Sequence, residues 1–511
     1  MVPVRWAATV ERAMPGGNVV IPTERGGWWH EYVCPTHGVE LSHDELLCGE
    51  FPAAGAACRH GCRIHTSAVR SAWTVLAHQA CAREIRRLAT VRPKVATALL
   101  RRYDELYHRL AADPHEGSQP WMLRGRLFHQ ALTEAIWAVS IGQAARVLGD
   151  PAPRLTRALA EAARAARDTL VEQGRFTSNY TAWLNAAGAV CTGDEEWLTG
   201  EHGVHQHIRA AVGDDGWEWE GSTYYHGFVL RAYLLALGDS TPPPDVAERL
   251  QRMARAFDAV TTSGGLVAAL HDGPYARPEL DREHAELRAL LPPRPARTEK
   301  VTVFRDVGYA VLRGAGIHAI VDFGPHGGSH GHRDKLALYL YGATTPWQPD
   351  PGQVPYGHRE WREHYASTAA HPTFSVDGGE QAECTGRLEV ADASGVTAVC
   401  DAAYPGVTAR RRVALDGDVL LDELTVAADR PRRIALHLRP DVRLTVSAGQ
   451  TRWAGAERLH GWHECACPSA ALVARPGPGP ADDPQRVRTH VDWVVPDATE
   501  VTFRSIYRVE D

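Results

Sequence analysis

The 511-residue sequence predicts an α+β multidomain protein in which a helical domain precedes an antiparallel β-sandwich. Three observations lead to this prediction. A chain of this length exceeds what one hydrophobic core usually supports, so at least two domains are expected. Apolar residues recur with the period of a helix from about residue 66 to 290, and with a period near two after residue 300. The proline-rich segment LPPRPARTEK, residues 291–300, separates the two patterns.

Residues 1–65 form a predicted cap that is rich in cysteine and histidine. The cap contains Cys34, His37, Cys48, Cys58, His60 and Cys62. The strings CPTHG and CRHGC are short glycine-containing turns of the kind that hold a structural metal, although their spacing fits no standard finger closely. Two interpretations stay open: that these residues bind zinc, and that the cap is only a loop-rich segment that packs on the helices. In GGWWHEY, the aromatic residues Trp28, Trp29 and Tyr32 form either a packing cluster or a sugar-binding surface.

Residues 66–295 form the predicted helical domain. The segment LTRALAEAARAARDTLVEQG ends at Gly174, a helix stop, and carries an apolar stripe of Leu155, Leu159, Ala162, Ala166 and Leu170. The segment DVAERLQRMARAFDAV begins at Asp245, a plausible N-cap, and carries an apolar stripe of Val246, Leu250, Met253 and Phe257. Periodicity alone gives only an all-helical domain.

Residues 300–511 form the predicted β domain. Apolar and polar residues alternate in VTVFRDVGYAVLRG and in RRRVALDGDVLLDELTVAA, which is typical of strands with one buried face. Asp416-Gly417 lies between two such runs and predicts a hairpin turn. A sandwich is the expected architecture.

The segment HGGSHGHRDKLALYLYGATTPWQPDPG, residues 326–352, is the most informative part of the chain. Its glycines permit tight turns and close approach of the backbone. In an extended segment, His330 and His332 point to the same face at the entrance of a predicted strand. Asp350 follows in a proline-rich turn, and His371 begins another alternating segment.

These side chains predict a metal site. Imidazole nitrogens and a carboxylate oxygen suit zinc, which takes about four ligands in a tetrahedron. The alternative is that the histidines lie on the surface beside a glycine turn. The glycine density, Asp350 and the second histidine-bearing segment favour the metal site.

These strings resemble a known family. GPHGGSHGHRDKLALYLYG, PWQPDPG and STAAHPTFSVDG are similar to the C-terminal half of heparinase II/III-type polysaccharide lyases and their alginate-lyase relatives. Residues 215–237 resemble the tyrosine-bearing helix of that family, and residues 178–190 resemble its asparagine-bearing helix. The resemblance covers roughly residues 120–380. It implies an incomplete (α/α) toroid followed by a β-sandwich, with the active site between them.

The resemblance also implies β-elimination on a uronate-containing glycan. Asn179, aided by His330, neutralises the substrate carboxylate, and Tyr225 is the base and acid, with Tyr224 as the adjacent alternative. Several family members have a histidine where this chain has Tyr180. This departure favours one tyrosine-based route, although Tyr180 itself, or Tyr356 or Tyr365, can supply a second phenol.

The resemblance assigns the metal ligands as well. His332, Asp350 and His371 match the family's ligands for a divalent metal, expected to be zinc, that supports the His330 loop rather than acting as a Lewis acid. We take Arg333, Arg124, Tyr356 and Trp183 as candidate substrate-binding residues. Further arginines that can pair with a carboxylate or sulfate are Arg126, which lies with Arg124 at an apparent helix start, and Arg359 and Arg362, which flank the tyrosine loop.

Composition limits the partners. With 55 basic and 62 acidic residues and a net charge of −7, the chain lacks the basic surface of a nucleic-acid binder, so an acidic polysaccharide or oligosaccharide must meet a local basic patch. No segment approaches a membrane span, and MVPVRWAATVERAMPGG has no signal-peptide pattern, so a cytoplasmic protein is expected. The ten cysteines then favour free thiols or metal ligation.

Three other functions stay open. A glycoside hydrolase on the same scaffold would use two carboxylates from Asp214, Asp215, Glu218 and Glu220. A uronate C5-epimerase would begin with the same proton abstraction. A non-catalytic glycan-binding protein would depend on the aromatic residues alone. The uronate and its linkage, sulfation dependence, endo or exo action, and whether the chain forms a homo-oligomer also stay open.

Overall fold

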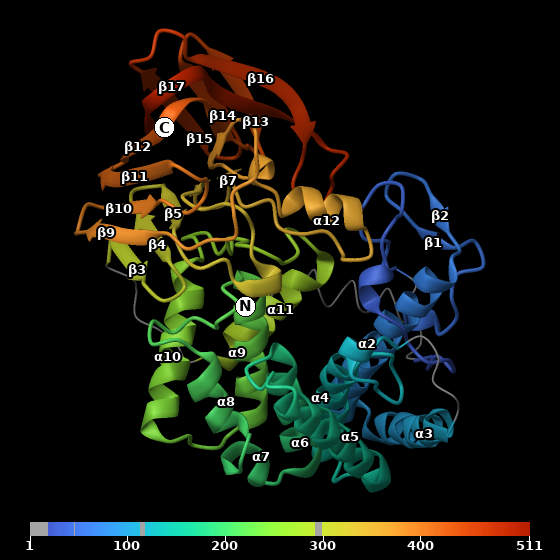
Figure 1. Ribbon diagram of the computed structural model, residues 1–511. Helices are drawn as coiled ribbons and strands as arrows, with labels where there is room; N and C mark the ends of the chain where they lie inside the picture. The colour runs from blue at the N-terminus through green and yellow to red at the C-terminus, as the bar shows by residue number, and fades with distance from the viewer. Residues whose placement is uncertain (1–18, 45, 113–117, 292–298, 511) are drawn as a thin grey trace. The chain divides into compact units, whose positions relative to one another are not determined.

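The computed structural model describes residues 19–44, 46–112, 118–291 and 299–510 (Figure 1). The chain forms two compact units. The helical unit comprises Met1–Ala211, Val229–Ala247 and Pro355–His358, and the sheet unit comprises Val212–Phe228, Glu248–Val354 and Arg359–Asp511. The predicted division at residues 65 and 300 stays a prediction. The N-terminal string at 1–17 and most of the predicted linker, residues 292–298, lie outside the described residues.

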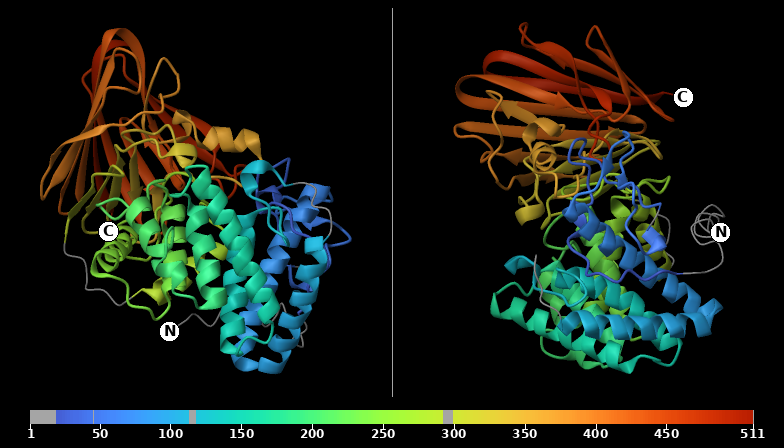
Figure 2. Two further views of the ribbon diagram at one scale, coloured as in Figure 1. Left: turned by 60° about the horizontal axis from the view of Figure 1, so that its bottom comes forward. Right: turned by 90° about the vertical axis from the view of Figure 1, so that its right-hand side faces the viewer.

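The helical unit is built from long helices that pack side by side, as the left view of Figure 2 shows. Helix α6 packs against both α4 and α5, and α2 packs against α3 and α4. The helices are α2 (Ser67–Val91), α3 (Pro93–Ala112), α4 (Ala131–Val147), α5 (Pro153–Glu172), α6 (Asn179–Thr192), α7 (Glu196–Thr199) and α8 (Val204–Ala211). Two further helices, α9 (Thr223–Leu237) and α10 (Pro244–Ala259), each contribute to both units.

The two predicted amphipathic helices form. In α5 the buried stripe runs through Leu155, Leu159 and Leu170, but it passes through Ala163 rather than Ala162. Gly174 follows the helix with a φ of 68°, as a C-terminal stop requires. In α10 the predicted apolar face is buried. The N-cap prediction is wrong, because α10 begins at Pro244 and Asp245 lies in its first turn.

The N-terminal cap has little regular structure. Its elements are η1 (Trp29–Glu31), η2 (Leu46–Cys48), β1 (Ala56–Ala57) and β2 (Arg63–Ile64). Its buried side chains, among them Cys34, Val39 and Leu41, share a small core with Trp73 of α2. The cap therefore buries its apolar side chains in a core that it shares with α2.

Buried histidines predict a dependence of stability on pH. His78, His207 and His226 are fully buried, and burial lowers the pKa of each to about 4. A histidine in the unfolded chain has a pKa of about 6.5, so between these values the unfolded chain binds protons that the folded chain does not. The free energy of unfolding should therefore fall as the pH falls from about 6.5 to about 4, by roughly 3 kcal/mol for each histidine.

A single substitution tests this dependence. In His207, Nδ1 lies 2.6 Å from the Tyr233 hydroxyl and Nε2 lies 3.1 Å from the Ser178 carbonyl oxygen, an arrangement that suits the neutral ring. His207→Gln should lower the melting temperature at neutral pH but flatten its fall in acid. The exposed His65 provides the control, because His65→Gln should follow the wild type. Parallel curves for His207→Gln and the wild type would contradict the assignment.

The sheet unit contains two antiparallel sheets. The smaller has the order β3-β4-β5-β6-β7, with β3 (Val301–Phe304), β4 (Tyr309–Arg313), β5 (His318–Asp322), β6 (Leu338–Tyr341) and β7 (Pro346–Gln348). The larger has the order β13-β14-β15-β17-β12-β11-β10-β9, and β8 and β16 pair with β12 and β17. One hydrophobic core lies between the sheets and includes Leu338 from the smaller sheet and Leu424 and Phe503 from the larger. This is the predicted β-sandwich.

The strands of the larger sheet cover most of the C-terminal chain, drawn in orange and red in Figure 1. They are β8 (Phe374–Val376), β9 (Arg387–Ala391), β10 (Gly395–Cys400), β11 (Val407–Asp416), β12 (Val419–Leu438), β13 (Arg443–Ser447), β14 (Gln450–Ala454), β15 (Arg458–Cys465), β16 (Ala471–Pro478) and β17 (Val487–Glu510). The predicted turn joins β11 to β12, where Asp416 pairs with Val419 and Gly417 has a φ of 63°.

The smaller sheet is buried on both faces. On the face away from the sandwich core, Tyr309, Ile320 and Tyr339 pack against Trp217 and Val260. Every residue of β6 is therefore buried, and the alternation predicted for this segment is lost. Helices α11 (Pro278–Leu290) and α12 (Arg359–Tyr365) complete the unit. Within the described residues, none of the helices has the length and apolar character that crossing a membrane requires.

Candidate active site

Tyr225 and His330 face each other in the sheet unit. Tyr225 lies in the first turn of α9, and its ring stacks on the imidazole of His330 with centroids 3.9 Å apart and planes 23° apart. Tyr224, the adjacent alternative, stacks instead on Phe228. The fold therefore brings the predicted base and one predicted carboxylate-stabilising group into contact.

Asp272 holds both histidines of the motif, and sequence reasoning missed it. One of its carboxylate oxygens lies 3.0 Å from Nδ1 of His330, and the other lies 3.3 Å from Nε2 of His332. Gln353 and Arg362 also donate to this carboxylate. Burial would raise the pKa of Asp272, but its hydrogen bonds to the two histidines outweigh burial and hold that pKa well below its usual range.

The loop that carries the histidines is compact rather than extended. The prediction that His330 and His332 share an extended segment is wrong, because Gly328–His330 forms the short helix η4. Two glycines allow the loop to close. A Cβ at Gly331 would overlap the carbonyl oxygen of His326, and Gly327 has a φ of 83°. Both imidazoles reach Asp272 from this closed loop.

His332, Asp350 and His371 converge as predicted for a metal site. Their ligand atoms all lie within 4.8 Å of one another. Nδ1 of His332 lies 3.0 Å from Nε2 of His371 and 3.5 Å from Oδ2 of Asp350, and Nε2 of His371 lies 3.7 Å from the same oxygen. Ligand atoms bound to zinc at about 2.05 Å in a tetrahedron stand about 3.3 Å apart, so the spacing fits.

The ring orientations also fit a metal. His371 donates from Nδ1 to the carbonyl oxygen of Ser367 at 2.8 Å, which leaves a lone pair on Nε2. Because Asp272 lies at Nε2 of His332, Nδ1 of that ring points toward the cluster. A carboxylate or carbonyl behind each ligating imidazole is the usual supporting arrangement at metal sites.

The cluster attracts positive charge. Burial disfavours a charged His332, but Asp350 and Asp272 outweigh burial and raise its pKa to about 10. Burial would likewise raise the pKa of Asp350, but His332 and His371 hold it well below its usual range. The same negative potential favours a divalent cation in place of the proton.

A second buried cluster beside it already contains a cation. His271, Asp322 and Asp334 also bring their ligand atoms together. Nζ of Lys335 lies 2.5 Å from Asp322 and 3.2 Å from Asp334, and this lysine is 1% exposed. An ammonium therefore already pairs with both carboxylates, and we do not assign a metal here.

Asn179 and Tyr180 begin α6 in the helical unit. Ser178 caps this helix by accepting a hydrogen bond from the Tyr180 backbone N–H at 3.3 Å, and Asn179 is its first residue. Burial raises the pKa of the Tyr180 phenol, and Gln130 donates to its oxygen at 2.5 Å. A phenol in this setting resists deprotonation.

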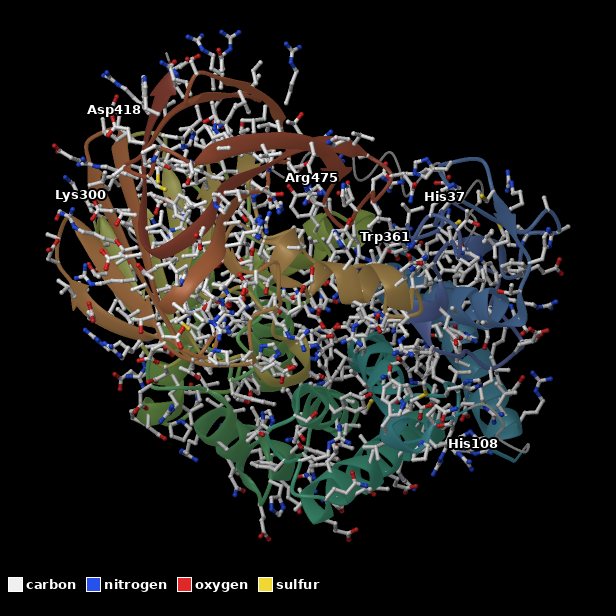
Figure 3. The ribbon with its side chains drawn as sticks, turned by 45° about the horizontal axis from the view of Figure 1, so that its top comes forward. His37, His108, Lys300, Trp361, Asp418 and Arg475 are labelled. Atoms are coloured by element: carbon white, nitrogen blue, oxygen red, sulfur yellow. The ribbon has the colours of Figure 1, made fainter. Side chains whose placement is uncertain are left out.

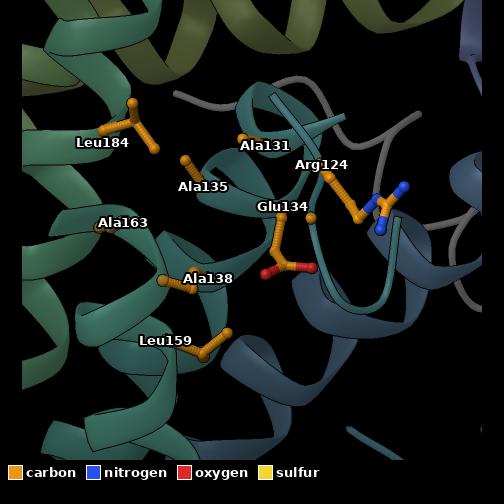
Figure 4. A pocket seen from close by; sticks show the side chains of 11 residues that line it. Arg124, Ala131, Glu134, Ala135, Ala138, Leu159, Ala163 and Leu184 are labelled. Atoms are coloured by element: carbon orange, nitrogen blue, oxygen red, sulfur yellow. The ribbon is translucent and has the colours of Figure 1, made fainter. Parts of the chain in front are cut away.

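Two of the candidate substrate-binding residues, Trp183 and Arg124, lie in the helical unit. Trp183 is 1% exposed, and the guanidinium of Arg231 lies 5.1 Å from its ring centroid. Arg124 lies in the loop before α4, so its prediction at a helix start is wrong, as is that of Arg126. Arg124 borders a pocket of about 20 Å³ that is too small for a sugar, and Figure 4 shows its guanidinium turned away from the apolar lining.

Tyr356 belongs to an aromatic cluster. Its ring stacks on His30 with a centroid separation of 4.1 Å, and His30 stacks on Trp29 at 3.7 Å. Trp28 contacts Trp121, which is 44% exposed. Half-buried rings of this kind offer flat faces to a sugar. Tyr32, in contrast, is buried and donates its hydroxyl to Ser42, so it belongs to the packing of the cap.

The arginines of the sheet unit differ in their surroundings. Arg333 pairs with the exposed Glu383 at 3.1 Å. Arg362 lies in α12, beside Trp361, which is labelled in Figure 3. Its guanidinium is 3.4 Å from Asp272 and 3.3 Å from the carbonyl oxygen of Ser329, and it is 37% exposed. Arg362 therefore contacts the carboxylate that holds both histidines.

The carboxylates that a hydrolase would need have other partners. Asp215 accepts hydrogen bonds from the backbone of Asp306 and Val307, and Asp214 pairs with Arg249. Glu218 is fully buried, and burial and the charge of Glu220 raise its pKa well above the usual range. Asp215 therefore holds the backbone of a neighbouring segment, and Glu218 is held in its protonated form by burial.

The architecture defines a class in which an incomplete (α/α) toroid precedes an antiparallel β-sandwich, as predicted. Residues 296–508 match the family model described as Heparinase II/III-like, C-terminal. The predicted resemblance to heparinase II/III-type lyases is therefore confirmed. No curated protein matches the chain.

Solved structures extend the similarity across most of the chain. A heparinase III is 13% identical with a TM-score of 0.66 and covers 86% of this chain and 78% of its own. A heparan sulfate lyase mutant from Pedobacter heparinus is 14% identical with a TM-score of 0.61, covering 88% and 78%. A Paenibacillus xanthan lyase is 10% identical with a TM-score of 0.51, covering 85% and 53%. At these identities the similarity establishes the fold.

Proposed function

We propose that this protein is a lyase that cleaves uronate-containing polysaccharides or oligosaccharides by β-elimination. The contact between Tyr225 and His330, with His330 held by Asp272, is the observation that carries the proposal. The family match and the lyase structures of the same fold support it. The reaction needs a base for the C5 proton, an acid for the C4 oxygen, and a group that stabilises the charge on the carboxylate.

The residues divide these tasks. Tyr225, as phenolate, removes the C5 proton and, as phenol, returns a proton to the leaving oxygen. His330 and the amide of Asn179 stabilise the negative charge that develops on the uronate carboxylate. Asp272 touches neither substrate atom in this scheme, and its task is to fix the orientation of His330. Tyr225 is 9% exposed, so little water competes for the phenol.

We further propose a divalent cation, zinc, bound by His332, Asp350 and His371. The three donors, their spacing and the supporting carboxylate of Asp272 fit zinc. When bound, it supplies a fixed positive charge that holds the loop carrying His330 in place. His330 of this loop, together with Tyr225 and Asn179, performs the chemistry described above.

The substrate is proposed to be an acidic glycan. Arg362 of α12 offers a guanidinium near His330, and Arg333 offers another on the loop that carries His330. Carboxylate or sulfate groups of the substrate can pair with these two side chains. The half-buried aromatic cluster with Trp28, Trp29 and Tyr356 supports a sugar-binding role in the helical unit. We also propose a cytoplasmic location, which favours oligosaccharides over long chains.

A substrate panel tests the proposal. The purified protein would be incubated with heparan, hyaluronan, chondroitin, alginate and glucuronan oligosaccharides while ultraviolet absorbance is recorded. A rise from the new C4–C5 double bond is expected with at least one of them. New reducing ends without absorbance would indicate a hydrolase. Inverted uronates without cleavage would indicate an epimerase, and binding without any product would indicate a glycan-binding protein.

The role of Asp272 predicts a defect in turnover. Asp272→Asn weakens the acceptor for both imidazoles, so His330 loses its fixed orientation. We expect kcat to fall by about ten- to a hundred-fold, with KM changed much less. Steady-state kinetics on the substrate found by the panel would show this split. A rise in KM at unchanged kcat would contradict the positioning role and place Asp272 in substrate binding.

A further inference from the structure

We propose that Cys34, His37, Cys58 and Cys62 form a structural zinc site in the N-terminal cap, apart from the proposed active site. The four ligand atoms lie within 4.8 Å of one another. The cluster belongs entirely to the helical unit, whereas His332, Asp350 and His371 belong to the sheet unit. Of the six cap residues that the sequence analysis singled out, the fold brings these four together. Figure 3 labels His37 in this region.

The distances match a tetrahedral metal. Nδ1 of His37 lies 3.4 Å from Sγ of Cys34, 3.6 Å from Sγ of Cys58 and 3.5 Å from Sγ of Cys62. Zinc bonds of about 2.3 Å to sulfur and about 2.05 Å to nitrogen place these atoms about 3.6 Å apart at the tetrahedral angle. One nitrogen is therefore nearly equidistant from three sulfurs, at the separation that a shared zinc requires.

Two tight turns present the ligands. In the first, the N–H of Gly38 donates to the carbonyl oxygen of Cys34 at 2.9 Å. In the second, the N–H of Gly61 donates to the carbonyl oxygen of Cys58 at 2.9 Å. Both glycines have a positive φ, 71° and 91°, which other residues rarely adopt. Each turn thus brings a pair of ligands, Cys34 with His37 and Cys58 with Cys62, to one side.

The sulfur of Cys58 accepts a backbone hydrogen bond. The backbone N–H of His60 donates to it at 3.4 Å. A donor of this kind stabilises negative charge on sulfur, which is the form that binds a metal. The ring of His60 lies beside that of His37, with centroids 4.7 Å apart, so His60 packs on a ligand. Cys48 is exposed and lies in η2, outside the cluster.

Zinc accounts for the arrangement better than a disulfide or simple packing. A disulfide would join only two of the three sulfurs and would leave His37 without a function. Packing alone would not direct three sulfurs at one ring nitrogen. Three thiolates and one imidazole are a preferred set for zinc and unsuitable for magnesium or calcium. Four protein ligands close the coordination sphere, which makes the site structural.

The fold of the cap explains why a structural metal would stabilise it. Within the described residues, the strands β1 and β2 have two residues each, and both cap helices are short 3-10 turns. Small segments with so little regular structure usually need a metal or a disulfide for stability. The metal would join residues 34–37 to residues 58–62 and so hold the cap against α2.

Metal analysis of four proteins tests the site. The wild type, Cys34→Ser/Cys58→Ser, Cys48→Ser and His371→Ala would be purified as full chains, dialysed and analysed for zinc. Cys34→Ser/Cys58→Ser should lose one zinc per chain relative to the wild type, and Cys48→Ser should lose none. His371→Ala reports on the other site, so failure of one proposal is distinguishable from failure of the other. Equal zinc in the double variant and the wild type would overturn the inference.

Cobalt provides a signature of sulfur ligation. In the cobalt-loaded wild type we expect a thiolate-to-cobalt charge-transfer band in the near ultraviolet. The band should persist in His371→Ala and disappear in Cys34→Ser/Cys58→Ser. If that double variant does not fold, a mercurial that blocks thiols should release one zinc from the wild type. Absence of both the band and the release would refute the site.

Discussion

Tyr225→Phe is expected to reduce turnover of a uronate glycan by about a hundred- to ten-thousand-fold, because it removes the only atom of this side chain that can accept and return a proton. The ring itself would remain stacked on His330, which it contacts at a centroid distance of 3.9 Å. Binding should therefore change little. Initial rates of double-bond absorbance, combined with a direct binding measurement, would separate the two effects.

The neighbouring residue is a matched control. Tyr224→Phe removes the same atom from the adjacent ring, which stacks on Phe228 rather than on His330. It should retain most of the activity. If Tyr224→Phe were inactive and Tyr225→Phe active, the assignment of the base would be reversed. If both were active, neither phenol would be the base, and the β-elimination scheme would need another group.

Asp422→Ala is expected to lower the free energy of unfolding by about 3–5 kcal/mol, because it leaves the buried Arg411 without its carboxylate. Arg411 and Asp422 are each 1% exposed and are joined by two hydrogen bonds of 2.7 Å. The same guanidinium donates to the carbonyl oxygens of Leu336 and Pro372 at 2.6 and 3.2 Å. Denaturant unfolding would measure the loss.

The adjacent strand position supplies the comparison. Arg410 pairs with Glu389 at 2.7 Å, but its side chain is 50% exposed. Arg410→Ala should cost less than about 1 kcal/mol, as exposed ion pairs usually do. Similar losses for Arg410→Ala and Asp422→Ala would show that burial does not set the strength of the Asp422 pair. Because Leu336 and Pro372 neighbour Lys335 and His371, a loosened Arg411 should also loosen the proposed metal site.

The sequence predicts the outline of the fold because its periodicities are local. The change from helical to alternating patterns near residue 300 reflects two different ways of burying apolar side chains. A strand that is buried on both faces does not show the alternation of buried and exposed residues. Tyr339 and Tyr341 look solvent-facing in an alternating strand, but the smaller sheet is covered on both sides and buries them.

The candidate site also contains some residues that the sequence predicts and one that it does not. His332, Asp350 and His371 stand in recognisable strings and converge as predicted. Asp272 stands in no motif, and its two histidine partners lie 58 and 60 residues away, so no local pattern reveals it. The only sequence signal was a charged HDG string after an apolar run, which resembles an ordinary turn. Pairing across such distances becomes visible only in the folded chain.

Lys335 implies that the two buried anionic clusters of the sheet unit respond differently to a chelator. The positive charge beside Asp322 and Asp334 belongs to a side chain, so chelation cannot remove it and the medium cannot exchange it. The charge proposed beside Asp350 comes from solution and depends on metal supply. Metal depletion would therefore act on one cluster alone and leave its neighbour paired with Lys335.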